Sequence, residues 1–230
     1  MKIAFLGDSI TTGKPGVNFV DPFKDKYPQH EFLNYGKGGD TVTSLLERLQ
    51  QMRIPQDIDI MVLMIGINDV YVKTAWWQPL LKRQMKQSWT KNASEFKAGY
   101  EALLDFILPL TDHLLVLSPT VVGEKVHNRF NRRLEQYSEL IPWLCSNLKI
   151  TYIDLHERFK DLLDNQRTAV YIQRSILRLK KDLDTLLTSE EVDDMSEERG
   201  LMLTLDGVHL NSKGAAVVHQ IIEDYLHPFL

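Results

Sequence analysis

A serine near the start of the chain and an aspartate-histidine pair near its end could together perform nucleophilic catalysis. Ser9 directly follows the apolar run 3–6 and Gly7-Asp8, and Asp206 precedes His209 by three residues. A serine hydroxyl is a weak nucleophile until a base takes its proton, and a histidine base works best when a carboxylate fixes its tautomer. At this spacing Asp206 can bond one ring nitrogen of His209 and leave the other free for Ser9.

Negative charge develops on the carbonyl oxygen during such an attack, so hydrogen-bond donors must face it. Two further polar stretches can supply them. In the stretch 36–41, Gly38 and Gly39 let a backbone N–H approach a ligand closely, and in the stretch 66–69 the side-chain amide of Asn68 can donate. Both stretches are also common turn patterns, as Asp8, Ser9 and Asp206 are common helix caps.

Five short apolar segments alternate with amphipathic ones, which predicts a doubly wound parallel sheet in a single domain, 1–230. The predicted strands are 2–6, 31–35, 59–65, 113–118 and 149–155, and the predicted helices include 41–52, 94–108, 129–148 and 214–226. The polar stretches follow predicted strands or lie in the last turn. In parallel sheets this edge binds ligands, so their joint occurrence favours the catalytic interpretation.

The segment 72–92 is longer than a plain connection and contains Trp76 and Trp77 among basic residues. It could form a substrate wall to which the tryptophans supply apolar contact, with Asp8, Asp69 and Val208 as further candidates. The alternative is a solvated basic helix whose tryptophans are anchored in the core.

The second long segment, 156–203, begins with a stretch free of proline and glycine. Within 169–187, apolar residues recur at spacings of three and four, as on a heptad seam. A continuous helix over 156–189 would be about 50 Å long, so it must bend back, project as a lid, or pair with a second copy in a homodimer. The acid-rich run 190–198 is predicted to be a solvated loop.

Composition excludes several classes of function. The 230 residues carry a net charge of -4, without the basic excess that nucleic-acid binding requires. No apolar stretch reaches the roughly 18 residues of a membrane span, and none resembles a signal peptide. The one cysteine, Cys145, is predicted to be a core thiol, which favours a reducing compartment and a cytoplasmic protein.

Neither a cofactor nor a metal is predicted. A phosphate-binding loop would need four residues between its glycines, but five separate Gly7 from Gly13 and Pro15 follows Lys14. The histidines form no His-Glu-x-x-His motif. The Gly-x-Ser-x-Gly elbow of α/β-hydrolases also fails, because Thr11 stands at its last position.

The stretches 7–9, 39–41, 66–69 and 206–211 resemble, in order, the conserved blocks of the SGNH hydrolases, also called GDSL-type esterases and lipases. This resemblance spans residues 2–226. It implies a flavodoxin-like three-layer α/β/α sandwich with strand order 2-1-3-4-5, and ester hydrolysis without a metal.

By the same resemblance, Ser9 is the nucleophile, His209 the general base and Asp206 its orienting carboxylate. The oxyanion hole would comprise the N–H groups of Ser9 and Gly39 and the amide of Asn68, with Gly38 as the rival glycine. Asp8 and Asp69 match the family blocks as well, and we expect them to hold their loops by hydrogen bonds.

The predicted activity is hydrolysis of carboxylic esters, short-chain acyl esters or acetylated carbohydrates above all, through an acyl-enzyme. The alternatives are a lysophospholipase or thioesterase acting on longer acyl chains, and a non-catalytic ligand-binding module on the same fold. The expected partner is a small-molecule ester.

Overall fold

A computed structural model describes residues 1–74 and 76–230, and its centre is a five-stranded sheet. All neighbouring strands pair in parallel, in the order β2-β1-β3-β4-β5. The strands are β1 (Lys2–Gly7), β2 (Glu31–Gly36), β3 (Ile58–Met64), β4 (Thr111–Leu117) and β5 (Thr151–Ile153). Their positions and order confirm the predicted flavodoxin-like fold.

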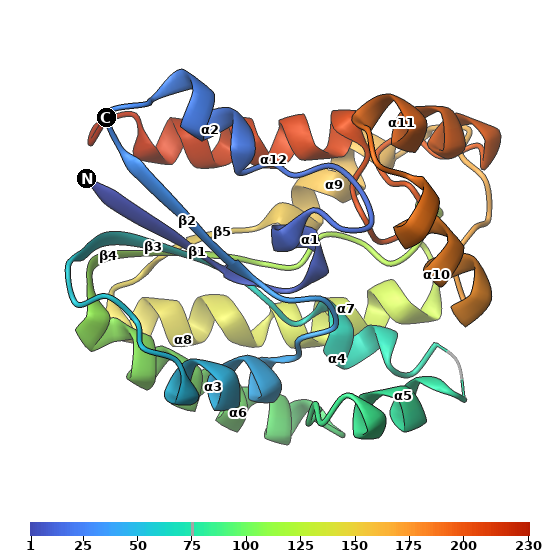
Figure 1. The fold of residues 1–230 in the computed structure, drawn as a ribbon. Coiled ribbons are helices and arrows are strands. Elements are labelled where there is room, and N and C mark those ends of the chain that lie inside the picture. Colours follow the sequence, from blue (N-terminus) through green and yellow to red (C-terminus); the bar gives the residue numbers. More distant parts are fainter. Residues whose placement is uncertain (75) are drawn as a thin grey trace.

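Helices cover both faces of the sheet and make three layers (Figure 1). One face carries α2 (Asp21–Lys26), α9 (Leu155–Leu163) and α12 (Ser212–Leu226), and the other carries α3 (Val42–Gln51), α6 (Ala93–Ile107), α7 (Arg129–Ser138) and α8 (Leu140–Leu148). The remaining helices are α1 (Ser9–Thr12), α4 (Ile67–Tyr71), α5 (Gln78–Gln84), the 3₁₀ helix η1 (Leu108–Leu110), α10 (Ile176–Thr185) and α11 (Ser189–Glu198). Both chain termini lie at the end of the sheet opposite α5 and α10 (Figure 1).

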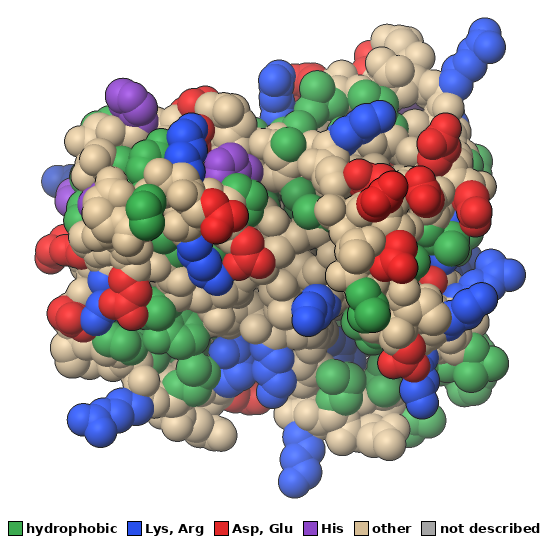
Figure 2. Space-filling view, turned by 45° about the horizontal axis from the view of Figure 1, so that its top comes forward, with side chains coloured by type: hydrophobic (Ala, Val, Ile, Leu, Met, Phe, Trp, Pro, Cys, Tyr) green, Lys and Arg blue, Asp and Glu red, His purple; other side chains and the backbone are tan. Residues whose placement is uncertain are grey.

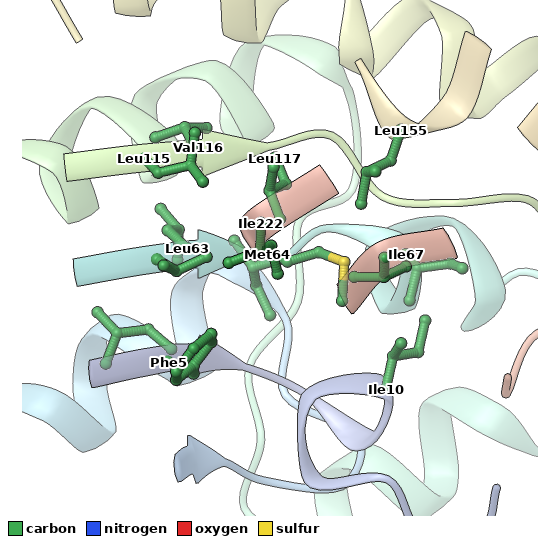
Figure 3. Packing of buried hydrophobic residues seen from close by; sticks show 14 of the residues in the cluster. Phe5, Ile10, Leu63, Met64, Ile67, Leu115, Val116, Leu117, Leu155 and Ile222 are labelled. Atoms are coloured by element: carbon green, nitrogen blue, oxygen red, sulfur yellow. The ribbon is translucent and has the colours of Figure 1, made fainter. Parts of the chain in front are cut away.

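The central strands are apolar throughout because both of their faces are covered. Residues 3–6 of β1 and 60–64 of β3 are all buried. Figure 3 shows Phe5 and Leu63 side by side from these neighbouring strands, with Ile222 of α12 among the residues of the same cluster. This rigid centre holds the strand ends from which the polar loops emerge.

Two helix assignments differ from the sequence-based ones. The predicted helix 129–148 is divided at Glu139 into α7 and α8. The acid-rich run 190–198, predicted to be a loop, belongs to α11, where Thr188 and Glu191 form a capping box at the start. Its acids are nevertheless solvated, and Figure 2 shows acidic side chains gathered at the upper right, where α11 lies.

The segment 156–189 does not form one continuous helix. The chain is helical in α9 and α10, and residues 166–175 between them are irregular. The N–H groups of Ala169 and Gln173 donate to the carbonyls of Gly200 and Asp206, at 2.8 and 2.9 Å. These donors are therefore unavailable to a helix. A dimer contact through residues 169–187 stays a prediction. Within that range, only α10 (Ile176–Thr185) is helical.

Within residues 1–74 and 76–230, the structure contains no helix that is both long and apolar enough to cross a membrane.

Candidate active site

The ends of three adjacent strands bring the polar loops to one edge of the sheet. Gly7 at the end of β1 pairs in register with Gly36 of β2 and with Met64 of β3. The loops that carry Ser9, Gly39 and Asn68 therefore leave the sheet at the same level, as parallel pairing requires. These three residues line one cavity together with His209.

The predicted catalytic residues form a continuous chain of hydrogen bonds. The Oγ atom of Ser9 lies 3.0 Å from Nε2 of His209, and Nδ1 of that histidine lies 2.8 Å from Oδ2 of Asp206. The other carboxylate oxygen, Oδ1, accepts the N–H groups of Val208 at 3.0 Å and His209 at 2.9 Å. Asp206 is fully buried, and these three hydrogen bonds fix the orientation of its carboxylate.

Asp8 caps the short helix α1, and this cap helps to present Ser9. Oδ1 of Asp8 accepts the N–H of Ile10 at 2.9 Å, and Ser9 is the first residue of the helix. The capping and catalytic interpretations of the Gly-Asp-Ser stretch are therefore compatible. They apply to neighbouring residues.

The turn that carries the aspartate-histidine pair is held by Glu124, a residue that sequence reasoning missed. Its buried carboxylate accepts the N–H groups of Met202, Leu203 and Thr204 at 2.7 to 2.8 Å, and the hydroxyl of Thr204 at 2.8 Å. Nothing in the local sequence marks a lone glutamate after a strand as such an anchor, because its partners lie about 80 positions away.

The irregular segment 166–175 lies directly against the same turn. A Cβ atom at Gly207 would come within 2.5 Å of the carbonyl oxygen of Tyr171, and the backbone at Gly207 has a φ of +89°. The backbone bond from Gln173 to the carbonyl of Asp206 lies beside this contact. Residues expected to form a helical seam thus form part of the wall that fixes the Asp206 turn.

The Asp206 carboxylate keeps His209 basic. Burial by itself lowers the pKa of His209, but the charge of Asp206 and the hydrogen bond between them outweigh burial and raise that pKa above its ordinary 6.5. For Asp206 the signs are reversed. Burial by itself raises the pKa of this carboxyl, but the attraction and hydrogen bonds of His209 more than offset burial, so the pKa lies below 3.8. The aspartate therefore stays ionised at neutral pH.

The raised histidine pKa predicts where activity is lost on the acid side. A general base must be unprotonated, so kcat/KM should fall as the pH drops through the pKa of His209, and the midpoint should lie above 6.5. Initial rates with p-nitrophenyl acetate, corrected for the uncatalysed reaction, would measure this from about pH 4 to about pH 9. A rate that stays constant down to about pH 4 would contradict a histidine base.

Two backbone donors of the predicted oxyanion hole are free to receive a ligand. Within residues 1–74 and 76–230, the N–H groups of Ser9 and Gly39 donate to no protein acceptor. The amide of Asn68 differs, because its Nδ2 donates to Oδ2 of Asp8 at 3.1 Å and to the carbonyl of Asp40 at 3.0 Å. Asn68 must share or exchange one of these bonds to reach an oxyanion.

Burial raises the pKa of Asp8 to about 7 despite the bond from Ile10 and the attraction of His209. Near neutral pH this carboxyl therefore takes up a proton readily. A neutral Asp8 binds the Asn68 amide less strongly than a carboxylate does, which lowers the cost of releasing that amide.

Most of the predicted substrate wall lies outside the cavity. Val208 lines it, but Asp8 and Asp69 are buried beneath the loops. As expected, Asp69 holds its surroundings together, accepting from Thr90 at 3.1 and 2.6 Å.

The two tryptophans, which the sequence suggested as apolar contacts of a substrate wall, lie outside the cavity as well. Trp76 is 87% exposed, and the indole N–H of Trp77 donates to the carbonyl of Arg174 at 2.9 Å. Neither tryptophan lines the cavity. Gln78, Leu81 and Lys82 of α5, which follow them in the chain, line it instead. The apolar lining comprises Pro15, Tyr71, Leu81, Met85, Ile176, Leu179, Leu183 and Val208.

In the part of the chain that the structure describes, no cluster of three or more His, Cys, Asp or Glu side chains is arranged to hold a metal ion.

The fold and these strand-end loops define a hydrolase of the SGNH type, with a flavodoxin-like sheet. The GDSL-like Lipase/Acylhydrolase family matches residues 5–217, and the chain belongs to that family. The chain is accordingly a carboxylic ester hydrolase of the GDSL class.

Named relatives are similar over most of the chain. An acetylxylan esterase of Geobacillus stearothermophilus is 24% identical over 184 residues, which cover 70% of this chain and 79% of the relative. The crystal structure of Axe2, an acetylxylan esterase from the same organism, matches with a TM-score of 0.67 at 20% identity, covering 97% of this chain and 92% of that one. The acetyl xylan esterase AlAXEase matches with a TM-score of 0.68 at 22% identity, covering 98% and 100%.

Proposed function

We propose that this protein hydrolyses short-chain carboxylic esters, acetylated carbohydrates above all, through an acyl-enzyme on Ser9. The observation that carries the proposal is the hydrogen-bonded chain from Ser9 through His209 to Asp206, whose first two residues line a ligand-sized cavity. A binding module would have no need for a base placed 3.0 Å from a serine hydroxyl.

In the first half-reaction, Nε2 of His209 takes the proton of Ser9 as Oγ bonds to the ester carbonyl carbon. The carbonyl oxygen gains negative charge and is held by the N–H groups of Ser9 and Gly39 and by the amide of Asn68. Collapse of this intermediate breaks the bond to the alcohol oxygen, which receives the proton from His209. Ser9 is left acylated.

In the second half-reaction, His209 takes a proton from water as the water oxygen attacks the acyl carbon. The same donors hold the second oxyanion. Ser9 leaves with the proton from His209, and the carboxylic acid is released. Asp206 keeps the imidazole oriented and stabilises its charged form in both halves.

The size of the cavity supports a small acyl group. Its volume is about 300 Å³, at the small end of ligand pockets. Leu179 and Leu183 of α10 and Leu81 of α5 are among its lining residues. A short acyl group with part of the alcohol would fill this space.

A second cavity beside the first supports a hydroxyl-rich alcohol. It measures about 380 Å³ and shares Lys14, Pro15 and Leu183 with the catalytic cavity. Half of its other lining residues have polar side chains, namely Thr12, Asn18, Asp21, Asp25, Thr188 and Ser189. Hydroxyl and carboxylate groups hydrogen-bond sugar hydroxyls well, and the named relatives are acetylxylan esterases.

The apolar wall favours a second candidate, an esterase for longer acyl chains. Leu81 and Met85 of α5 and Ile176 and Leu179 of α10 line the catalytic cavity. If the acyl chain lay along this wall, each added CH₂ would contribute about 0.8 kcal/mol, which is roughly fourfold in kcat/KM.

A panel of p-nitrophenyl acetate, butyrate and octanoate, with acetylated xylo-oligosaccharides as natural-type esters, distinguishes the two candidates. We expect the highest kcat/KM with acetyl esters and release of acetate from the oligosaccharides. A steady rise from acetate to octanoate would favour the longer-chain esterase. No hydrolysis above the Ser9→Ala background for any ester would overturn both.

A further inference from the structure

We propose that Gln87 and Lys82, both in the segment after α4, are positioning residues that fix the oxyanion donor at Gly39. The proposal rests on the proposed function, because it concerns the oxyanion hole of that reaction. It gives the segment 72–92 a role that differs from the substrate wall that its tryptophans suggested.

Gln87 holds the peptide unit that contains the Gly39 N–H. Its Nε2 donates to the carbonyl of Gly38 at 3.1 Å and to Oδ1 of Asp40 at 3.1 Å, and the side chain is buried. The carbonyl of Gly38 and the N–H of Gly39 belong to one planar unit and point in opposite directions. Fixing that carbonyl therefore fixes the direction of the N–H.

Lys82 holds the next peptide unit. Its ammonium group donates to the carbonyl of Gly39 and lies 3.3 Å from Oε1 of Gln87. On the other side of this unit, the N–H of Asp40 donates to the carbonyl of Lys37 at 3.1 Å. Both peptide units that meet at the Gly39 Cα atom are thus held, and Lys82 also braces Gln87.

The glycine loop needs such support because it has no side chains of its own. Gly38 and Gly39 are adjacent, and Gly39 has a φ of +78°, which glycine adopts readily and other residues do not. A Cβ atom at Gly39 would lie 2.9 Å from Oε1 of Gln87 and 3.0 Å from Nζ of Lys82. The pair therefore packs directly against the glycine.

Charge keeps Lys82 in place within this buried region. The side chain is only 3% exposed, and burial lowers its pKa to about 8, against the attraction of Asp69, Asp8 and Asp40. At neutral pH the lysine is therefore mostly an ammonium ion, whose hydrogen bond to a carbonyl is stronger than that of a neutral donor. Its positive charge also lies at the wall of the cavity in which the oxyanion forms.

The test compares Gln87→Met and Lys82→Met with Ser88→Ala. Ser88 is the matched control, since its hydroxyl donates to Thr43 Oγ1 at 2.8 Å from the same segment but touches neither Gly38 nor Gly39. With p-nitrophenyl acetate we expect kcat to fall about tenfold in both methionine variants while KM changes less than about twofold, because a donor that acts on the oxyanion stabilises the transition state alone. Ser88→Ala should match the wild type.

A second readout separates positioning from general loss of structure. A p-nitrophenyl phosphonate forms a tetrahedral adduct on an active serine and places an oxygen in the oxyanion hole, so its rate of inactivation should fall by the same factor as kcat. Gln87→Glu keeps the shape of the side chain but lacks the N–H donor, and it should show the same loss if Gln87→Met fails to fold. Thermal unfolding of each variant checks the fold.

Three results would overturn the proposal: an unchanged kcat in folded Gln87 variants, a rise in KM with kcat intact, or an equal loss in Ser88→Ala. Failure of the proposed function would give a different result, because the wild-type protein itself would then show no hydrolysis that depends on Ser9.

Discussion

Ser9→Ala should lower kcat for p-nitrophenyl acetate by about 10⁶-fold, which leaves only the residual rate, about 10³- to 10⁴-fold above the uncatalysed reaction, that the oxyanion donors and substrate binding supply. The variant has no hydroxyl to form the acyl-enzyme, and water in its place would lack the alignment that Ser9 has with Nε2 of His209 at 3.0 Å. The substitution removes a single oxygen from a buried residue whose N–H stays in place, so binding of a non-reactive ester analogue should persist.

Ser146→Ala is the matched control, because Ser146 is an exposed serine of α8 on the face of the sheet covered by α3 and α6. Its activity should equal that of the wild type. Mass spectrometry after treatment with a fluorophosphonate should place the label on Ser9 and leave the Ser9→Ala protein unlabelled. Equal hydrolysis by wild type and Ser9→Ala, or a label on another serine, would refute the mechanism.

Asp206→Asn should lower kcat by about 10⁴-fold with little change in the fold. Oδ1 of the asparagine would keep accepting the two N–H groups that Asp206 accepts now, so its NH₂ group would face Nδ1 of His209. An NH₂ group can only donate there, which leaves the proton on Nε2. The histidine would then be in the tautomer that cannot accept a proton from Ser9.

The pH profile of this variant gives a second measurement. The charge of Asp206 raises the pKa of His209, so its removal should move the acid limb of the residual kcat/KM to lower pH. Asp184→Asn, at an exposed position of α10, is the control and should keep both the rate and the profile. A near-normal kcat in Asp206→Asn would show that another group orients the histidine.

The strands were predictable because each is a short apolar run between polar residues, and buried parallel strands demand that pattern. The grouping of Ser9 and Asn68 followed from the same step, since parallel strands place their carboxyl ends at one edge. His209 and Asp206 were predictable as a pair because their spacing of three lets them meet within one turn.

The first part of the predicted helical seam 169–187 is not helical, because local pattern and long-range bonding disagree there. Apolar residues at spacings of three and four favour a helix, but the backbone donors of Ala169 and Gln173 are taken by carbonyls more than 30 positions later in the chain. The tryptophans were mispredicted for a related reason. Aromatic content suggests a ligand wall, whereas only the direction of α5 decides that Leu81 and Met85 face the cavity.

The sequence by itself determined the sheet, the edge at which the site lies and the residue types that perform the chemistry, because these follow from local periodicity and short spacings. Only the tertiary structure decided that Glu124 anchors the Asp206 turn, that Asn68 is bonded to Asp8, and that Gln87 and Lys82 hold the glycine loop. A buried glutamate, glutamine or lysine has no local signature. Its role depends on which distant backbone groups folding leaves without a partner.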